Sequence, residues 1–196
     1  MKYFFLISGL MILSTSADEI VPNAGQTILL RGTSKQEGEI RVVSGEQDST
    51  GHGPITYYQV PFREGTLSVS WKVEKEQSVA FIFDAVNQGK ATHLLKVIVN
   101  GGPGTKSRSD HLTLITYDGS SRAKKKARVV RNEHHATPGE WHQISVSISG
   151  DQVTVIIDGR EFKTTSARFS EVIHKIGVAH SSGNLHTRLV KISKVK

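Results

Sequence analysis

One β-hairpin constrains the fold of this chain more than any other stretch. Residues 139–159 read GEWHQISVSISGDQVTVIIDG, and apolar residues alternate with polar ones on both sides of Gly150 and Asp151. If Gly150 and Asp151 form a two-residue turn, the apolar residues pair on one side of the ribbon: Ile148 with Val153, Val146 with Val155 and Ile144 with Ile157. The polar residues pair on the other side: Ser147 with Thr154 and Gln143 with Asp158. A shift of one residue would set apolar residues against polar ones, so the turn and the pattern predict the same register.

The beginning of the chain has the composition of a secretory signal peptide. Lys2 is followed by an apolar run over residues 3–13 and then by small residues that end at Ala17. The run is too short to span a bilayer of about 30 Å, and no second long apolar run follows, so the sequence predicts no integral membrane segment. We expect cleavage after Ala17 and a single exported domain, periplasmic or secreted, over residues 18–196.

The chain contains no cysteine, which excludes disulfides, thiolate catalysis and cysteine-based metal sites. Its formal charge is +7 and becomes +6 once Lys2 is removed with the signal peptide. A basic protein favours an acidic partner or surface. Because an exported protein does not meet nucleic acid as its ordinary partner, we expect an acidic or sulfated glycan or another anionic polymer. The sequence leaves the oligomeric state unknown.

Short strands separated by turns make up the rest of the sequence. Residues 65–73 alternate strictly, with Leu67, Val69, Trp71 and Val73 on one side, whereas residues 79–84 are apolar on both sides and are expected at the centre of a sheet. Further strands are expected at residues 26–30, 39–43, 55–60, 92–99, 111–117, 172–179 and 187–195. Turn-forming residues at 44–54 and 180–186 predict exposed loops. Since no stretch has the apolar spacing of a surface helix, we predict an all-β, antiparallel two-sheet sandwich of the jelly-roll type.

Residues 138–162 and 175–195 together resemble the concanavalin A-like lectin/glucanase superfamily, and within it the laminin-G-like and 3-keto-disaccharide hydrolase-type domains of secreted bacterial proteins. The matching residues are Gly139, Glu140 and Trp141 before one strand and Asp158 and Gly159 after its partner. The resemblance covers the C-terminal third well and residues 67–117 loosely. It implies a jelly-roll fold and a carbohydrate-associated function. Glucanases of the superfamily use a Glu-x-Asp-x-x-Glu strand, which this sequence does not contain.

A glycosidase would need two carboxylates about 5 to 10 Å apart, and the sequence alone does not pair them. The candidates are Asp84, Asp110, Asp118, Glu133, Glu140 and Asp158. Two of these, Asp118 and Asp158, precede glycines and also suit turns. The sequence has no Gly-x-Ser-x-Gly nucleophile elbow and no phosphate-binding glycine motif, so the catalytic residues stay unknown and no cofactor is predicted.

The histidines and tryptophans each admit two interpretations. None of the nine histidines form His-x-His or His-x-x-x-His, and the adjacent His134 and His135 would face opposite sides of a strand. We therefore predict no metal site, although ligands from separate strands could still converge. Trp71 has apolar neighbours at spacing two and is expected in the core. Trp141 could stack on a sugar, but a tryptophan that opens a hairpin strand more often packs in a core or corner.

The basic segment, residues 122–131 (RAKKKARVVR), is the one local concentration of charge. We predict a binding site for an anionic ligand formed by Lys124, Lys125, Lys126 and Arg128 with the nearby His134 and His135. On a strand, Lys124, Lys126 and Arg128 would share one face at a spacing of about 7 Å, which suits an extended anionic glycan. The alternative is a solvated turn of like charges.

Three functions remain open from the sequence. The first is an exported, non-catalytic jelly-roll module that binds a glycan or an acidic envelope component. The second is a glycoside hydrolase of the 3-keto-disaccharide hydrolase type, and the third is a structural or assembly role. Convergent carboxylates or a histidine–carboxylate metal cluster would favour the enzyme, whereas a shallow polar face would favour binding.

Overall fold

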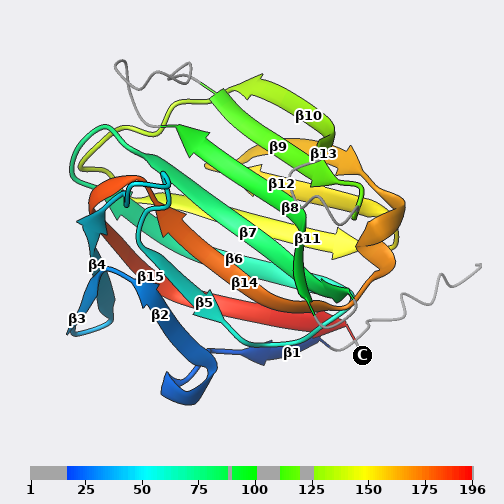
Figure 1. Cartoon of the computed structure of the whole chain (residues 1–196), viewed down its shortest axis with the longest axis horizontal. Helices are drawn as coiled ribbons and strands as arrows, with labels where there is room; N and C mark the ends of the chain where they lie inside the picture. Colours follow the sequence, from blue (N-terminus) through cyan, green and yellow to red (C-terminus); the bar gives the residue numbers. More distant parts are fainter. Residues whose placement is uncertain (1–16, 88–89, 101–110, 120–125, 196) are drawn as a thin grey trace, which may run out of the picture.

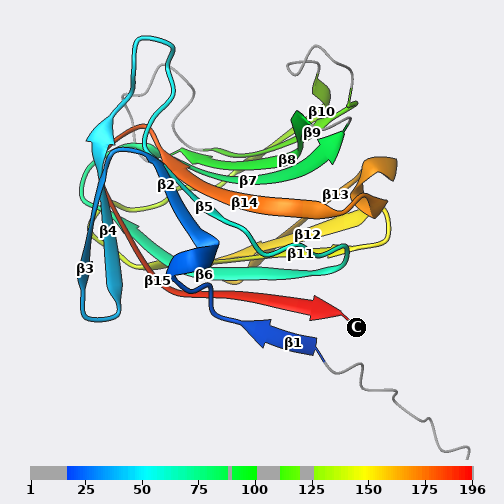
Figure 2. The ribbon, with the colours of Figure 1, turned by 60° about the horizontal axis from the view of Figure 1, so that its bottom comes forward.

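The structure is a computed structural model, and it describes residues 17–87, 90–100, 111–119 and 126–195. Two antiparallel β-sheets lie face to face, as Figures 1 and 2 show. The predicted all-β two-sheet sandwich is therefore confirmed. The predicted signal peptide lies outside the described residues, apart from Ala17.

The first sheet, called the β7 sheet, has the strand order β10-β9-β8-β7-β14-β5-β2. Its strands are β2 (Thr27–Arg31), β5 (Ile55–Tyr58), β7 (Ser78–Asn87), β8 (Lys90–Asn100), β9 (His111–Tyr117), β10 (Lys126–Glu133) and β14 (Ile173–His180). The apolar strand that was expected to lie centrally is β7, and it does lie in the middle of this sheet. Figure 2 shows that the sheet is curved, with its outer face on the concave side.

The second sheet, called the β6 sheet, has the order β13-β12-β11-β6-β15-β4-β3, and β1 pairs with β15. Its strands are β1 (Ala17–Ile20), β3 (Thr33–Glu37), β4 (Ile40–Glu46), β6 (Gly65–Val73), β11 (His142–Ser149), β12 (Gln152–Ile157), β13 (Arg160–Thr165) and β15 (Ser182–Val195). Within the described residues, helical structure is limited to two 3-10 turns, η1 (Ala24–Gln26) and η2 (Ala167–Ser170). No helix in the described residues is long and apolar enough to cross a membrane.

The predicted hairpin is β11 and β12, and its register is confirmed. Ile144 pairs with Ile157 and Val146 with Val155, on the apolar side, while Ser147 pairs with Thr154 on the other side. Gly150 has a φ of 57°, a value that glycine adopts without strain and that the turn requires. The hairpin therefore forms where turn chemistry and hydrophobic pattern agree.

The core lies between β6 and β7. Trp71 of β6 is buried, as expected, and its ring centroid lies 6.4 Å from that of Phe81 of β7. Apart from Ile156, which is 40% exposed, the apolar residues of β11 and β12 are almost completely buried against the same core. Since each fully buried aliphatic side chain contributes about 1.5 to 3 kcal/mol, this core can stabilise the fold without disulfides.

The prediction of an exposed turn at residues 180–186 is wrong. Only Ser181 separates β14 from β15, and the chain passes there from one sheet to the other. Residues 182–187 of β15 pair with β4, and Leu185 is buried. The serines, Gly183 and Asn184 suggest a turn locally, but a distant partner strand supplies the pairing that holds them extended.

The first strands also differ from expectation. β2 and β4 form close to residues 26–30 and 39–43, where strands were expected, and β2 lies at the edge of its sheet. β4, however, is covered by β3, which occupies the stretch between these two expected strands. All five residues of β3 are exposed. An edge strand that is exposed on both faces carries no hydrophobic period, so the sequence offers no signal for it.

Candidate ligand-binding site

The outer face of the β7 sheet, which points away from the core, carries large side chains that are themselves buried. On β7 the outer residues Ile82 and Asp84 are 7% and 2% exposed, and on β9 Ile115 and Tyr117 are 5% and 7% exposed. These residues alternate along their strands with the core residues and do not belong to the core cluster. The curved sheet therefore gathers a second group of buried side chains on its concave side.

Asp84 lies at the centre of this face. Its Oδ1 is 2.5 Å from Nδ1 of His93 on β8, and its Oδ2 is 3.8 Å from Nζ of Lys175 on β14. The register of the sheet explains the meeting, because His93 and Lys175 are the cross-strand partners of Asp84 on its two sides. A β-bulge adjoins each pairing, and bulges commonly re-aim side chains near functional sites. Two partners that can carry positive charge offset the cost of burying this carboxylate.

Two tyrosines flank the Asp84 group. Lys175 Nζ lies 4.0 Å from the centre of the Tyr57 ring, and the His93 ring lies 5.3 Å from the Tyr117 ring. Gly177 is opposite Tyr57, and a Cβ at Gly177 would come within 2.9 Å of that ring. The glycine thus allows the Tyr57 ring to lie against the sheet.

Both tyrosines are held in the neutral form. Burial, with a smaller contribution from the charge of Asp84, raises the pKa of Tyr57 and that of Tyr117 to about 12. Their hydroxyl groups can therefore donate and accept hydrogen bonds at physiological pH, but they are poorly suited to act as bases. An aromatic ring with a neutral hydroxyl group suits a ligand that has both apolar and hydroxylated surfaces.

The described part of the basic segment, from Lys126 onward, lies beside this face. Lys126, the first residue of β10, pairs with Tyr117 of β9. Arg128 is exposed on β10 and pairs with Thr116, and Arg131 is exposed and pairs with Thr113 on the outer side. Lys124 and Lys125 lie outside the described residues, as does the side chain of Lys126. The predicted role of the basic segment in binding stays a prediction.

The two adjacent histidines face opposite environments. His135 is exposed, whereas His134 is buried with its ring 6.5 Å from that of Phe162. Burial lowers the pKa of His134, and its Nε2 lies 3.6 Å from Oδ2 of Asp158. The structure therefore does not bring His134 to the surface where an anionic polymer would bind.

The candidate catalytic carboxylates are dispersed. Asp84 lies on the β7 sheet, whereas Asp158 lies in the turn between β12 and β13 of the β6 sheet, where it bonds to His142 Nδ1 at 2.7 Å and accepts a hydrogen bond from the Gln143 backbone at 2.8 Å. These two do not share a site. Asp118, Glu133 and Glu140 are exposed, and Asp110 lies outside the described residues. Among the residues described, no group of three or more histidine, aspartate or glutamate side chains could hold a metal ion.

Trp141 is neither a core residue nor an open sugar platform. It is partly exposed on the β6 sheet, and the guanidinium carbon of Arg188 lies 4.0 Å from the centre of its ring. Lys72 Nζ lies 5.5 Å from the same ring. Because the guanidinium group covers the ring, a sugar would have to displace Arg188 to stack there.

Most of the Asp84 group could not be predicted from the sequence. Lys96 belongs to the same group, because its Nζ lies 6.0 Å from the centre of the Tyr117 ring. Tyr57, His93, Lys96 and Lys175 come from three strands, β5, β8 and β14, and none belongs to a motif. The one available signal was Asp84 itself, an acidic residue in a strand that is otherwise apolar on both sides. A charge in such a strand must meet partners from neighbouring strands, but only the fold shows which ones.

Comparison with known proteins supports the fold. No protein-family model and no curated protein sequence matches the chain. Among solved structures, the carbohydrate-binding module CBM66 from Bacillus subtilis is similar with a TM-score of 0.61 and 10% identity, over 85% of this chain and 94% of that one. A "putative glycosyl hydrolase" from Parabacteroides distasonis gives 0.61 and 11%, over 87% and 94%. A double mutant of congerin II gives 0.54 and 13%, over 68% and 95%. The chain thus has the jelly-roll fold of lectin- and glucanase-like proteins.

Proposed function

We propose that this protein is an exported module that binds a glycan on the outer face of the β7 sheet. The observation that carries the proposal is the Asp84 group: a buried carboxylate that holds His93 and Lys175 between two neutral tyrosines. Sugars are bound by aromatic surfaces together with a few fixed polar groups, and the Asp84 group combines these features. The solved structures with this fold include a carbohydrate-binding module and a congerin II bound to lactose, which agrees with the proposal.

Within this site, Asp84 positions other residues and does not itself meet the ligand. Its side chain is 3% exposed, whereas those of His93 and Lys175 are 29% and 28% exposed. If His93 donates its Nδ1 proton to Asp84, its Nε2 is left for the ligand. The ligand-contacting groups are then His93, Lys175, Lys96 and the tyrosines.

We expect the preferred glycan to be acidic. Lys96, Lys175 and Arg131 are cationic and belong to the outer face or its edge, and the basic segment continues from Lys126 beside Tyr117. The carboxylate of Asp84 is already engaged by His93 and Lys175. A uronic acid or a sulfate group would find cations on this face and at its β10 edge.

The second candidate is a glycoside hydrolase of the 3-keto-disaccharide hydrolase type. The observation in its favour is the Asp84–His93 contact, because a histidine held by a carboxylate can move a proton. The exposed surface of this pair, however, presents one histidine instead of two facing carboxylates. Binding is therefore the function that the geometry supports better.

A glycan array with the purified protein tests the proposal, with hydrolysis products monitored in parallel. We expect retention on glycans that carry uronic acids or sulfates and no release of sugar. Lys175→Ala should lose binding, whereas the control Ser68→Ala, on the outer face of the β6 sheet, should keep it. Binding to no glycan, or binding unaffected by Lys175→Ala, would remove the proposal. Released sugar would favour the hydrolase.

A further inference from the structure

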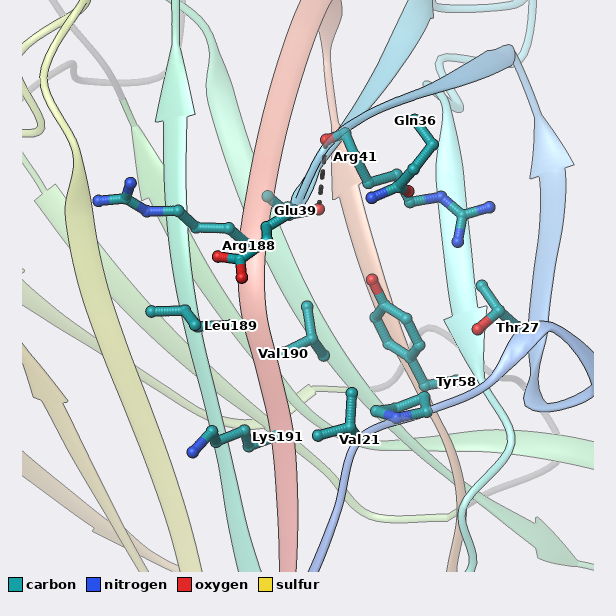
Figure 3. A pocket seen from close by; sticks show the side chains of 12 residues that line it. Val21, Thr27, Gln36, Glu39, Arg41, Tyr58, Arg188, Leu189, Val190 and Lys191 are labelled. Carbon is teal, nitrogen blue, oxygen red and sulfur yellow. Dashed lines mark hydrogen bonds between the residues drawn. The ribbon is translucent and has the colours of Figure 1, made fainter.

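A cavity of about 340 Å³ lies at the edge of the sandwich, away from the Asp84 group. β4 pairs with residues 182–187 of β15, and β1 pairs with residues 192–195. Residues 188–191 therefore meet no described strand on that side. Figure 3 shows the resulting opening, with Val21 and Tyr58 on the same side of β15.

The wall of the cavity on the β15 side is strained and apolar. Leu189 and Val190 form a bulge between the pairs Arg188–Ser70 and Lys191–Ser68. Leu189 has a φ of 53°, which a leucine rarely adopts, and the residue is 54% exposed. Val21, across the opening, is 66% exposed. Strained backbone often occurs at ligand sites, and the exposed aliphatic groups give this cavity an apolar lining for a ligand.

The inner end of the cavity is polar, and Arg41 supplies its charge. Nε of Arg41 is buried and has no hydrogen-bond partner, and its guanidinium group forms no ion pair with any carboxylate that the structure describes. The hydroxyl group of Tyr58 lies at the same end. Burial raises the pKa of Tyr58, while Arg41 and a hydrogen bond with Thr187 oppose that rise, which agrees with a guanidinium group close to the hydroxyl.

The other cations that line the cavity are already engaged. The guanidinium group of Arg188 stacks on Trp141 at 4.0 Å, and in Figure 3 this side chain extends away from the opening. Lys191 Nζ pairs with Glu19 at 2.9 Å. Glu39 adds one exposed carboxylate at the rim. Arg41 is thus the cation that is left for a ligand.

We propose that this cavity binds a small organic carboxylate with an apolar body, about the size of an aromatic acid. The carboxylate would lie on Arg41 and the Tyr58 hydroxyl, because a guanidinium group binds a carboxylate through two parallel hydrogen bonds. The body would lie against Val21, Pro22 and Val190. The volume is at the lower end of the range for ligand sites, which suits a small ligand. This site is separate from the proposed glycan face and does not depend on it.

Benzoate is the probe for this proposal, and benzamide, which has the same shape without the charge, is its control. The side-chain Nε–H signal of Arg41 in a ¹⁵N-labelled protein should shift and saturate with benzoate. We expect benzamide to bind about tenfold more weakly or worse, since a hydrogen bond to a charged group is stronger than one to a neutral group. Equal responses to benzoate and benzamide, or no saturable response to benzoate, would overturn the proposal.

Two variants test whether Arg41 is the residue that causes the preference for benzoate over benzamide. Arg41→Gln should lose the preference for benzoate, whereas Arg188→Gln should keep it, because Arg188 extends away from the cavity. If Arg41→Gln does not fold, Arg41→Lys retains the charge without the paired hydrogen-bond geometry and should bind benzoate more weakly than the parent. A preference that survives in Arg41→Gln, or that disappears in Arg188→Gln, would place the anion elsewhere.

Discussion

The outer faces of the two sheets differ, although both sheets pack on the same core. On the β6 sheet the side chains that point away from the core include several short hydroxylated ones, Thr66, Ser68, Ser145, Ser147 and Thr154, together with Gln143 and the exposed Ile156. On the β7 sheet they are large and buried: Ile82, Asp84, Ile115 and Tyr117. The β7 sheet surrounds a buried charge with aromatic and aliphatic groups, which is the arrangement of a binding site.

The largest expected effect on stability is at a core position of the β11–β12 hairpin, compared with an outer position of the same hairpin. Val155→Asp should destabilise the protein by about 4 kcal/mol or more, because Val155 is completely buried opposite Val146 and a charge there has no partner. Thr154→Asp, one residue away on the outer face of the β6 sheet, should change stability by about 0.5 kcal/mol. Urea unfolding of the two variants measures the difference, and similar losses would mean that the faces are assigned wrongly.

A second pair of variants compares the two outer faces directly. Asp84→Asn should destabilise the protein by about 1 to 3 kcal/mol, because it leaves His93 and Lys175 beside a neutral amide in a buried setting. Ser145→Ala, at an outer position of the β6 sheet, should stay within about 0.5 kcal/mol of the parent. Thermal unfolding followed by circular dichroism measures both. If Asp84→Asn is as mild as Ser145→Ala, the outer face of the β7 sheet is an ordinary solvated surface.

Alkaline pH should affect the β7 face through its tyrosines. The pKa values of Tyr57 and Tyr117 are raised to about 12 in the fold, above the ordinary value of 10.0. Below pH 10 both tyrosines are protonated in the folded and in the unfolded protein, so their titration does not lower the free energy of unfolding. Between pH 10 and 12 the unfolded chain loses protons that the fold retains, so stability should fall as pH rises.

The absorbance of tyrosinate measures this titration. Because the charge of Asp84 is the second cause of both shifts, Asp84→Asn should lower both pKa values without returning them to 10.0. Values that do not change in Asp84→Asn would show that the carboxylate lies farther from the rings than the structure has it.

The smallest expected effect on stability comes from the basic segment. Replacing Lys124, Lys125 and Lys126 with Ser should leave the melting temperature nearly unchanged and should reduce retention on a heparin or dextran-sulfate column. The contacts are electrostatic, so retention of the parent should weaken as the Debye length falls from about 10 Å at 0.1 M salt to about 3 Å at 1 M. Elution of the variant at the same salt concentration as the parent would leave the β7 face alone as the binding surface.

The sequence predicted the fold where local and long-range signals agree. The β11–β12 hairpin, strand β6 and the central position of β7 were all predicted from period and turn chemistry. Strand β3 and residues 182–186 were missed, because an exposed edge strand has no hydrophobic period and because pairing with β4 overrides the turn formers around Gly183.

The candidate site was much less predictable than the fold. His93, Lys175 and Tyr57 meet Asp84 only through the register of β8, β14 and β5, and two β-bulges adjust that register. No spacing along the chain contains this information. The basic segment was visible because its charges are adjacent in sequence, which shows that sequence analysis finds local clusters and misses those that a sheet assembles.

Mapping the bound glycan by nuclear magnetic resonance tests the central claim most directly. The best glycan from the array is titrated into ¹⁵N-labelled protein, and the shifted backbone amides are assigned to the two sheets. The account predicts that the shifts gather around Tyr57, Asp84, His93, Lys175 and Tyr117. Shifts gathered instead around Ser68, Ser145 and Thr154 on the outer face of the β6 sheet would contradict it.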